Sequence, residues 1–107
     1  MTWKVAFFSA SLENELSGLP PGLLAKFLRY SERLETYGPH LGMPHTRVMG
    51  DGLVELRVKA AEGIVRVFFC IAVGRRVVLL HQFQKKTART PRRELEIARR
   101  RMREITT

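Results

Sequence analysis

The residues best suited to chemistry are polar side chains set at alternating positions within apolar segments. Glu55 and Arg57 lie two apart in one such segment, Arg66 lies in a second, and His81 and Lys85 lie in and just after a third. Successive side chains of a β-strand point to opposite faces, so residues two apart share a face. If the three segments are neighbouring strands with these faces aligned, one surface displays all five residues.

These residue types suit cleavage of an RNA phosphodiester by its neighbouring 2′-hydroxyl. That reaction needs a group to take the hydroxyl proton, a group to protonate the leaving oxygen, and cations to hold the charge that builds on the phosphate. His81 is the natural proton carrier, because histidine titrates near neutral pH. Glu55 either orients His81 or acts as the base. Arg57 and Arg66 bind the phosphate through planar donor groups, with Lys85 as a further cation.

Aromatic and basic residues around this surface predict contacts to the bases and the backbone of RNA. Phe68 and Phe83 share the parity of the polar residues and are suited to stack on bases. The basic residues expected to bind the backbone are Lys86, Arg89, Arg92 and Arg93.

Each assignment has a structural alternative that the sequence leaves open. Glu55 and Arg57 can simply pair within the sheet. His81 can be a partly buried histidine with satisfied hydrogen bonds, and Phe68 and Phe83 can be core residues. The basic residues from Lys85 onward can form a solvated face.

The elements that must position these residues are three strands, expected over residues 53–59, 64–73 and 77–84. Their links are short enough for hairpins, which predicts an antiparallel meander. A strand over residues 3–9 precedes a short helix capped by Ser9 or Ser11, and a second helix runs from the prolines to Gly38. Thr90 is expected to cap a last helix that Pro91 opens.

The predicted order is therefore β-α-α-β-β-β-α, an α+β fold. The N-terminal strand and the helical hairpin would pack on an antiparallel sheet. Helices most easily cover one side of such a sheet, which would leave its other face free as a concave working surface.

The positive charge is concentrated in the second part of the chain. The 107 residues carry a formal net charge of +9. Residues 1–44 contain four basic and four acidic residues, whereas residues 45–107 contain fifteen basic and six acidic ones. Such a basic surface attracts polyanions, nucleic acid above all, although charge alone does not distinguish DNA, RNA and membrane.

Length and composition predict a single domain over residues 1–107, located in the cytoplasm and without a membrane partner. No segment approaches the roughly 20 apolar residues of a membrane helix, and residues 5–8 are too short for a signal peptide. Cys70, the single cysteine, lies in an apolar run and is expected in the core. His40 and His45 have no companion at a metal-ligand spacing, so no metal or cofactor is expected.

Four blocks of sequence occur in order between residues 43 and 105. They are GLVELR from Gly52, VRVFF from Val65, LLHQFQKKT from Leu79, and Pro91 followed by Glu94 and Ala98. Together they resemble the phage-derived, HigB-like branch of the RelE/ParE toxin superfamily.

The resemblance implies a compact α+β toxin that cleaves mRNA on the ribosome, inhibits translation, and is neutralised by a small helix-turn-helix antitoxin encoded beside it. The family's functional positions fall on Glu55, Arg57, Arg66, His81, Phe83, Lys85 and Lys86. The family often has tyrosine where this chain has Val54, or Phe68 and Phe69. A function that needs tyrosine at those positions is therefore not implied.

Two other functions remain open within this resemblance. ParE-like members share the architecture but poison DNA gyrase without cutting RNA. A gyrase poison has no need of a histidine beside two strand arginines, so His81, Arg57 and Arg66 favour a nuclease. A non-catalytic nucleic-acid-binding relative, or one that only titrates antitoxin, is the third reading.

Overall fold

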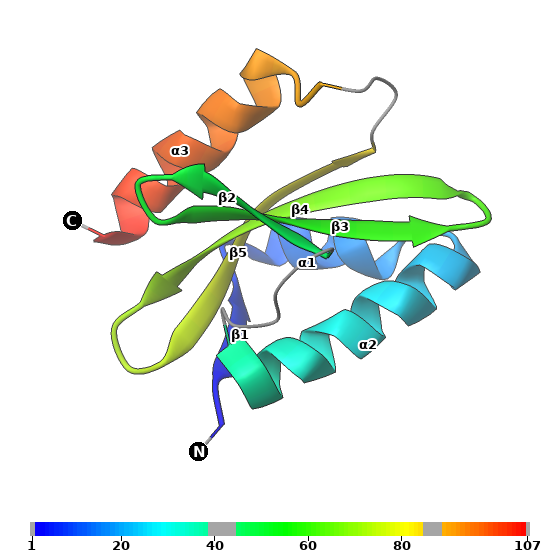
Figure 1. The fold of residues 1–107 in the computed structure, drawn as a ribbon, viewed down its shortest axis with the longest axis horizontal. Coiled ribbons are helices and arrows are strands. Elements are labelled where there is room, and N and C mark those ends of the chain that lie inside the picture. The colour runs from blue at the N-terminus through cyan, green and yellow to red at the C-terminus, as the bar shows by residue number, and fades with distance from the viewer. Residues whose placement is uncertain (1, 39–44, 85–88, 107) are drawn as a thin grey trace.

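The computed structural model describes residues 2–38, 45–84 and 89–106, in which five strands form one sheet and three helices pack against it (Figure 1). The elements in chain order are β1 (Lys4–Phe7), α1 (Ala10–Ser17), α2 (Pro21–Tyr37), β2 (Thr46–Gly50), β3 (Leu53–Ala60), β4 (Gly63–Ala72), β5 (Arg76–Gln84) and α3 (Arg92–Thr106). The predicted α+β class is confirmed.

The sheet contains one strand more than the sequence predicted, and it is mixed rather than antiparallel. Its order is β1-β5-β4-β3-β2, with β1 parallel to β5 and every other pair antiparallel. The additional strand is β2, which forms a hairpin with β3 around Asp51. Most of its side chains are exposed at the sheet edge, so it lacks the alternation of apolar residues that would have predicted it.

The boundaries of α1 and α2 follow the predicted signals. Ser9 caps α1 by accepting a hydrogen bond from the backbone N–H of Leu12 at 3.1 Å. Pro21 occupies the first turn of α2, where the missing N–H costs nothing. The helix ends at Gly38, whose φ of 63° suits glycine; a Cβ there would also lie 2.4 Å from the ring of Trp3.

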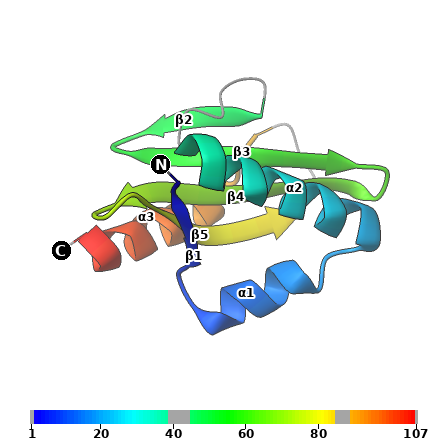
Figure 2. The ribbon, with the colours of Figure 1, turned by 90° about the horizontal axis from the view of Figure 1, so that it is seen from below.

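Helices cover both faces of the sheet, which corrects the expectation that one face stays free. On one face α1 and α2 pack against apolar side chains such as Leu56, Val67 and Leu79. On the other face α3 buries Ala98 and Met102 against Phe68 and neighbouring residues. Figures 1 and 2 show α3 on the opposite side of the sheet from α1 and α2.

A β-bulge in β5 changes which residues share a face. Phe69 pairs with Leu79 and Phe68 pairs with His81, so Leu80 is an extra residue in the ladder. Leu80 therefore packs on the α3 face, where His81 also lies, although strict alternation placed these two residues on opposite faces.

Cys70 belongs to the core on the α3 face and is 2% exposed, as the sequence predicted. Burial raises the pKa of its thiol. The neutral thiol is therefore favoured in the folded state, which keeps the reactive thiolate scarce at neutral pH.

Within the described ranges, none of the helices combines the length and the apolar character needed to cross a membrane.

Candidate active site

The predicted polar residues do gather on one face of the sheet. Glu55 pairs with Phe68, which pairs with His81 on the next strand, and Arg57 pairs with Arg66 directly across the β3–β4 hairpin. Directly paired residues share a face, so Glu55, Arg57, Arg66 and His81 form one compact group. The requirement that the two arginines and the histidine share a face is met.

Glu55 is fully buried and holds Arg66 in place. Its Oε1 accepts from Arg66 Nη1 at 2.5 Å, and its Oε2 accepts from the hydroxyl of Thr90 at 2.8 Å. Both carboxylate oxygens are therefore engaged, which corrects the expectations that Glu55 orients His81 or acts as the base, and the alternative that it pairs with Arg57. In this arrangement Glu55 positions the guanidinium of Arg66.

His81 is paired with Glu94 from the first turn of α3. Its Nε2 lies 2.7 Å from Glu94 Oε1. An ionised carboxylate only accepts hydrogen bonds, so Nε2 of the neutral ring carries the proton. The other ring nitrogen, Nδ1, then has the free lone pair that a general base requires. Glu94 fixes this tautomer, as carboxylates that accept a hydrogen bond from a functional histidine do elsewhere.

Two buried polar atoms in this group have no hydrogen-bond partner among the described residues: Arg66 Nε and His81 Nδ1. Buried polar groups are nearly always hydrogen-bonded, so each exception needs an explanation, and a catalytic role is one of them. One of these atoms donates a hydrogen bond and the other accepts one. Arg66 Nε can therefore donate a hydrogen bond to a negatively charged oxygen, and His81 Nδ1 can take up a proton.

Phe68 and Phe83 lie under α3 instead of on an open surface. Phe68 is fully buried and Phe83 is 9% exposed, with their ring centroids 5.7 Å apart. The physical reason is that the apolar side of α3 covers this part of the sheet. The expectation that they form a platform for RNA bases is corrected: both are core residues.

The predicted backbone-binding residues fall into two groups. Arg89, Arg92 and Arg93 are exposed at the start of α3, and Arg92 is bonded to Glu96 at 3.1 Å. Lys85 and Lys86 lie outside the described residues. Arg57 is exposed beside the buried Arg66, so it is the accessible cation of the arginine pair.

Sequence reasoning missed the contributions of Thr90 and Glu94, and also that of Arg47. Thr90 bonds to Glu55 instead of capping α3, which begins at Arg92. Arg47 is paired with Glu55 in the sheet and lines a pocket of about 440 Å³ with Arg89 and Thr90. The only signal for Glu94 was its place in the block that follows Pro91, which gave no role.

The bond between Glu94 and His81 is expected to hold the N-terminal end of α3 on the sheet. Replacing Glu94 with alanine removes a charge-assisted hydrogen bond that is mostly shielded from water. Amide exchange at residues 96–100, measured by native-state NMR, should therefore become about 10-fold faster, which is roughly 1.4 kcal/mol.

Glu96→Ala is the matched control for this experiment. It changes the same residue type on the same helix, but its partner Arg92 is almost fully exposed, so exchange should change less than twofold. Equal effects of the two substitutions would contradict a holding role for Glu94.

In the described part of the chain, no cluster of three or more histidine, cysteine or acidic side chains is arranged to hold a metal ion.

Comparison with known proteins agrees with the fold and with the sequence blocks. The structure is similar to that of the archaeal RelE–RelB complex from Pyrococcus horikoshii OT3, with a TM-score of 0.60 and 20% identity over 82% of this chain and 100% of the matched chain. This similarity confirms the RelE-like fold. No curated protein matches the sequence. The family model described as "Phage derived protein Gp49-like (DUF891)" matches residues 14–103. The chain therefore belongs to the phage-derived Gp49-like family, within the RelE/HigB type of toxins.

Proposed function

We propose that this protein is the toxin of a type II toxin–antitoxin pair and that it inhibits translation by cleaving mRNA in the decoding site of the ribosome. Family membership and the RelE-like fold support a toxin. The observation that carries the nuclease activity is the group formed by Arg66, Arg57 and His81, in which Arg66 Nε and His81 Nδ1 have no partner among the described residues.

In the proposed reaction the 2′-hydroxyl of the RNA is the nucleophile, and these side chains assist its attack. His81 Nδ1 takes the proton of the 2′-hydroxyl as that oxygen attacks the adjacent phosphorus. Arg66 and Arg57 stabilise the negative charge on the phosphate oxygens. The bond to the 5′ oxygen breaks, and that oxygen takes up a proton, for which Lys85 is the candidate donor. The products are a 2′,3′-cyclic phosphate and a 5′-hydroxyl.

Access to this site requires the start of α3 to move. Arg66 is 8% exposed, and the side chain of His81 is 12% exposed beneath Glu94. Among the described residues, the hydrogen bonds of Thr90 to Glu55 and of Glu94 to His81 hold the start of α3 over these side chains. Contact with RNA must therefore break or rearrange the bond of Thr90 to Glu55, whereas the bond of Glu94 to His81 has to be kept or re-formed for His81 Nδ1 to act as the base.

Toe-printing of a translating ribosome tests the proposal directly. With the purified protein present, the mRNA should be cut within the codon in the decoding site, and no cut should appear without it. Intact mRNA at concentrations that stop growth would refute the nuclease function. Inhibition of gyrase supercoiling in the same preparation would then favour the ParE-like alternative.

The proposed partner is a small helix-turn-helix antitoxin with acidic or apolar surface that covers the basic face or holds α3. Reading the open reading frame beside the gene is the simplest test. A short helix-turn-helix protein there supports the toxin assignment, and an unrelated neighbour counts against it.

A further inference from the structure

A second group of positive charge lies at the edge of the sheet, outside the group around Arg66. There β3 extends beyond β2, whose pairing with β3 begins at Thr46 and Leu56. The backbone N–H of Arg57 donates a hydrogen bond to the carbonyl of His45 at 2.8 Å. Past this point β2 no longer covers the edge of β3, and a pocket of about 230 Å³ opens. Its lining residues are Lys26, Tyr30, His45, Arg57 and Lys59.

The cations of this pocket are not neutralised by acidic side chains. No carboxylate lines the pocket, and Lys26, Arg57 and Lys59 form no ion pair with any described residue. By contrast, Arg66, Arg92 and Arg99 each have an acidic partner. Uncompensated positive charge in a concave site attracts an anion, because the low-dielectric walls focus the field.

A rigid pair of polar rings forms one wall of the pocket. The hydroxyl of Tyr30 lies 3.2 Å from His45 Nδ1, and the two ring centroids are 4.9 Å apart. Tyr30 is 5% exposed, so its ring is fixed in the core of the α2 face while its hydroxyl reaches the pocket. The wall therefore adds preorganised polar groups beside the ammonium of Lys26.

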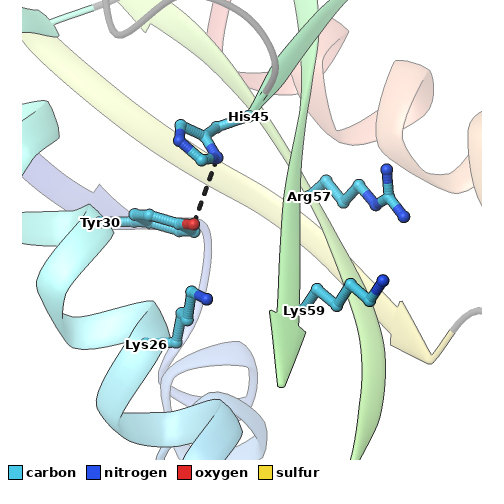
Figure 3. A pocket seen from close by; sticks show the side chains of 5 residues that line it. All are labelled: Lys26, Tyr30, His45, Arg57 and Lys59. Carbon is cyan, nitrogen blue, oxygen red and sulfur yellow. Dashed lines mark hydrogen bonds between the residues drawn. The ribbon is translucent and has the colours of Figure 1, made fainter. Parts of the chain in front are cut away.

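The lining residues approach from two sides of β3. Figure 3 shows Lys26, Tyr30 and His45 on one side of the strand, with Arg57 and Lys59 extending from the strand on the other. An extended chain of negative charges that crosses the edge of β3 reaches both.

We propose that this pocket is a subsite for a backbone phosphate of single-stranded RNA, next to the phosphate that is cleaved. Arg57 connects the two places, because it lines the pocket and is paired with Arg66, at a Cα separation of roughly 4.5–5.5 Å for such pairs. The proposed path of the RNA runs from Arg66 over the edge of β3 to Lys26. Naming RNA as the ligand rests on the proposed function.

The test measures binding without cleavage and without the ribosome. The probe is a mixed-sequence 2′-O-methyl oligoribonucleotide, which lacks the attacking hydroxyl, and its affinity is measured by fluorescence anisotropy over a series of salt concentrations. Lys26→Gln should weaken binding about 5- to 10-fold. It should also reduce the slope of log affinity against log salt by about 0.7, the value for one lost phosphate contact on a single strand.

Arg29→Gln is the matched control, because it removes one charge from an exposed residue of the same helix that does not line the pocket. It should leave the salt slope unchanged. Equal slopes for the two variants overturn the subsite, since the effect of Lys26 would then be general electrostatics. If the two slopes are equal and Lys26→Gln also binds an acidic antitoxin more weakly, the pocket is a protein-binding site instead. Because cleavage is not measured, intact mRNA in toe-printing overturns the nuclease function without affecting this result.

Discussion

Cleavage of ribosome-bound mRNA is expected to fall at least about 100-fold when Arg66 is replaced by alanine. In the proposed reaction Arg66 supplies donors to the phosphate, and loss of one preorganised donor to a developing charge typically costs a factor of about 10² to 10³ in rate. The measurement is the rate of appearance of the toe-print cut at saturating protein. Circular dichroism at the assay temperature establishes that the variant is folded.

Two further arginine variants make this result specific. Arg76→Ala removes an exposed charge from the far end of β5 and should change the rate less than twofold. Arg57→Ala removes an exposed arginine that forms no ion pair with any residue the structure describes, so the variant should fold normally. Its cleavage rate should fall about 10- to 100-fold, as expected for one charged hydrogen bond. If Arg66→Ala is folded and cleaves as fast as Arg76→Ala, the site has been assigned to the wrong residues.

The largest effect on stability is expected at Glu55. Replacing it with alanine leaves Arg66 buried without its anion and leaves the hydroxyl of Thr90 without its acceptor. Removing one partner of a buried ion pair typically costs about 3–5 kcal/mol. Urea titration should show this loss in the free energy of unfolding. Glu96→Ala, which breaks an exposed pair, should cost less than about 1 kcal/mol.

A double variant separates the cost of an unpaired charge from the cost of lost packing. Glu55→Leu combined with Arg66→Met replaces both charges with apolar side chains of similar length. This protein should be clearly more stable than Glu55→Ala, because no buried charge remains without a partner. A double variant as unstable as Glu55→Ala would show that the ion pair is not the source of the effect.

The sequence predicted the β3–β4 part of the site because that hairpin is regular. The turn around Ala61 and Glu62 is short, and the strands pair without interruption from Val54 and Phe69 to Ala60 and Gly63. Counting alternate residues therefore placed Glu55, Arg57 and Arg66 on one face correctly. The helical hairpin was equally predictable, since Ser9 and Gly38 mark its ends.

The sequence could not predict what covers that face. The helical spacing of Leu95, Ala98 and Met102 matches the side of the last helix that is buried, but no local pattern states which face of a sheet a helix will cover. Thr90 was therefore assigned only as a helix cap, and Glu94 was assigned no role. The bulge at Leu80 was also not predictable, because an extra residue in an apolar strand leaves no change in composition.

The parallel pairing of β1 with β5 joins strands that are far apart in the sequence, so the sheet can be completed only late in synthesis of the chain. β1 precedes the other four strands in the chain and lies at the sheet edge, next to β5, which ends at Gln84. A nascent chain that stops before β5 leaves β1 without a neighbour and lacks His81. Fragments that end before β5 are therefore expected to lack the proposed activity.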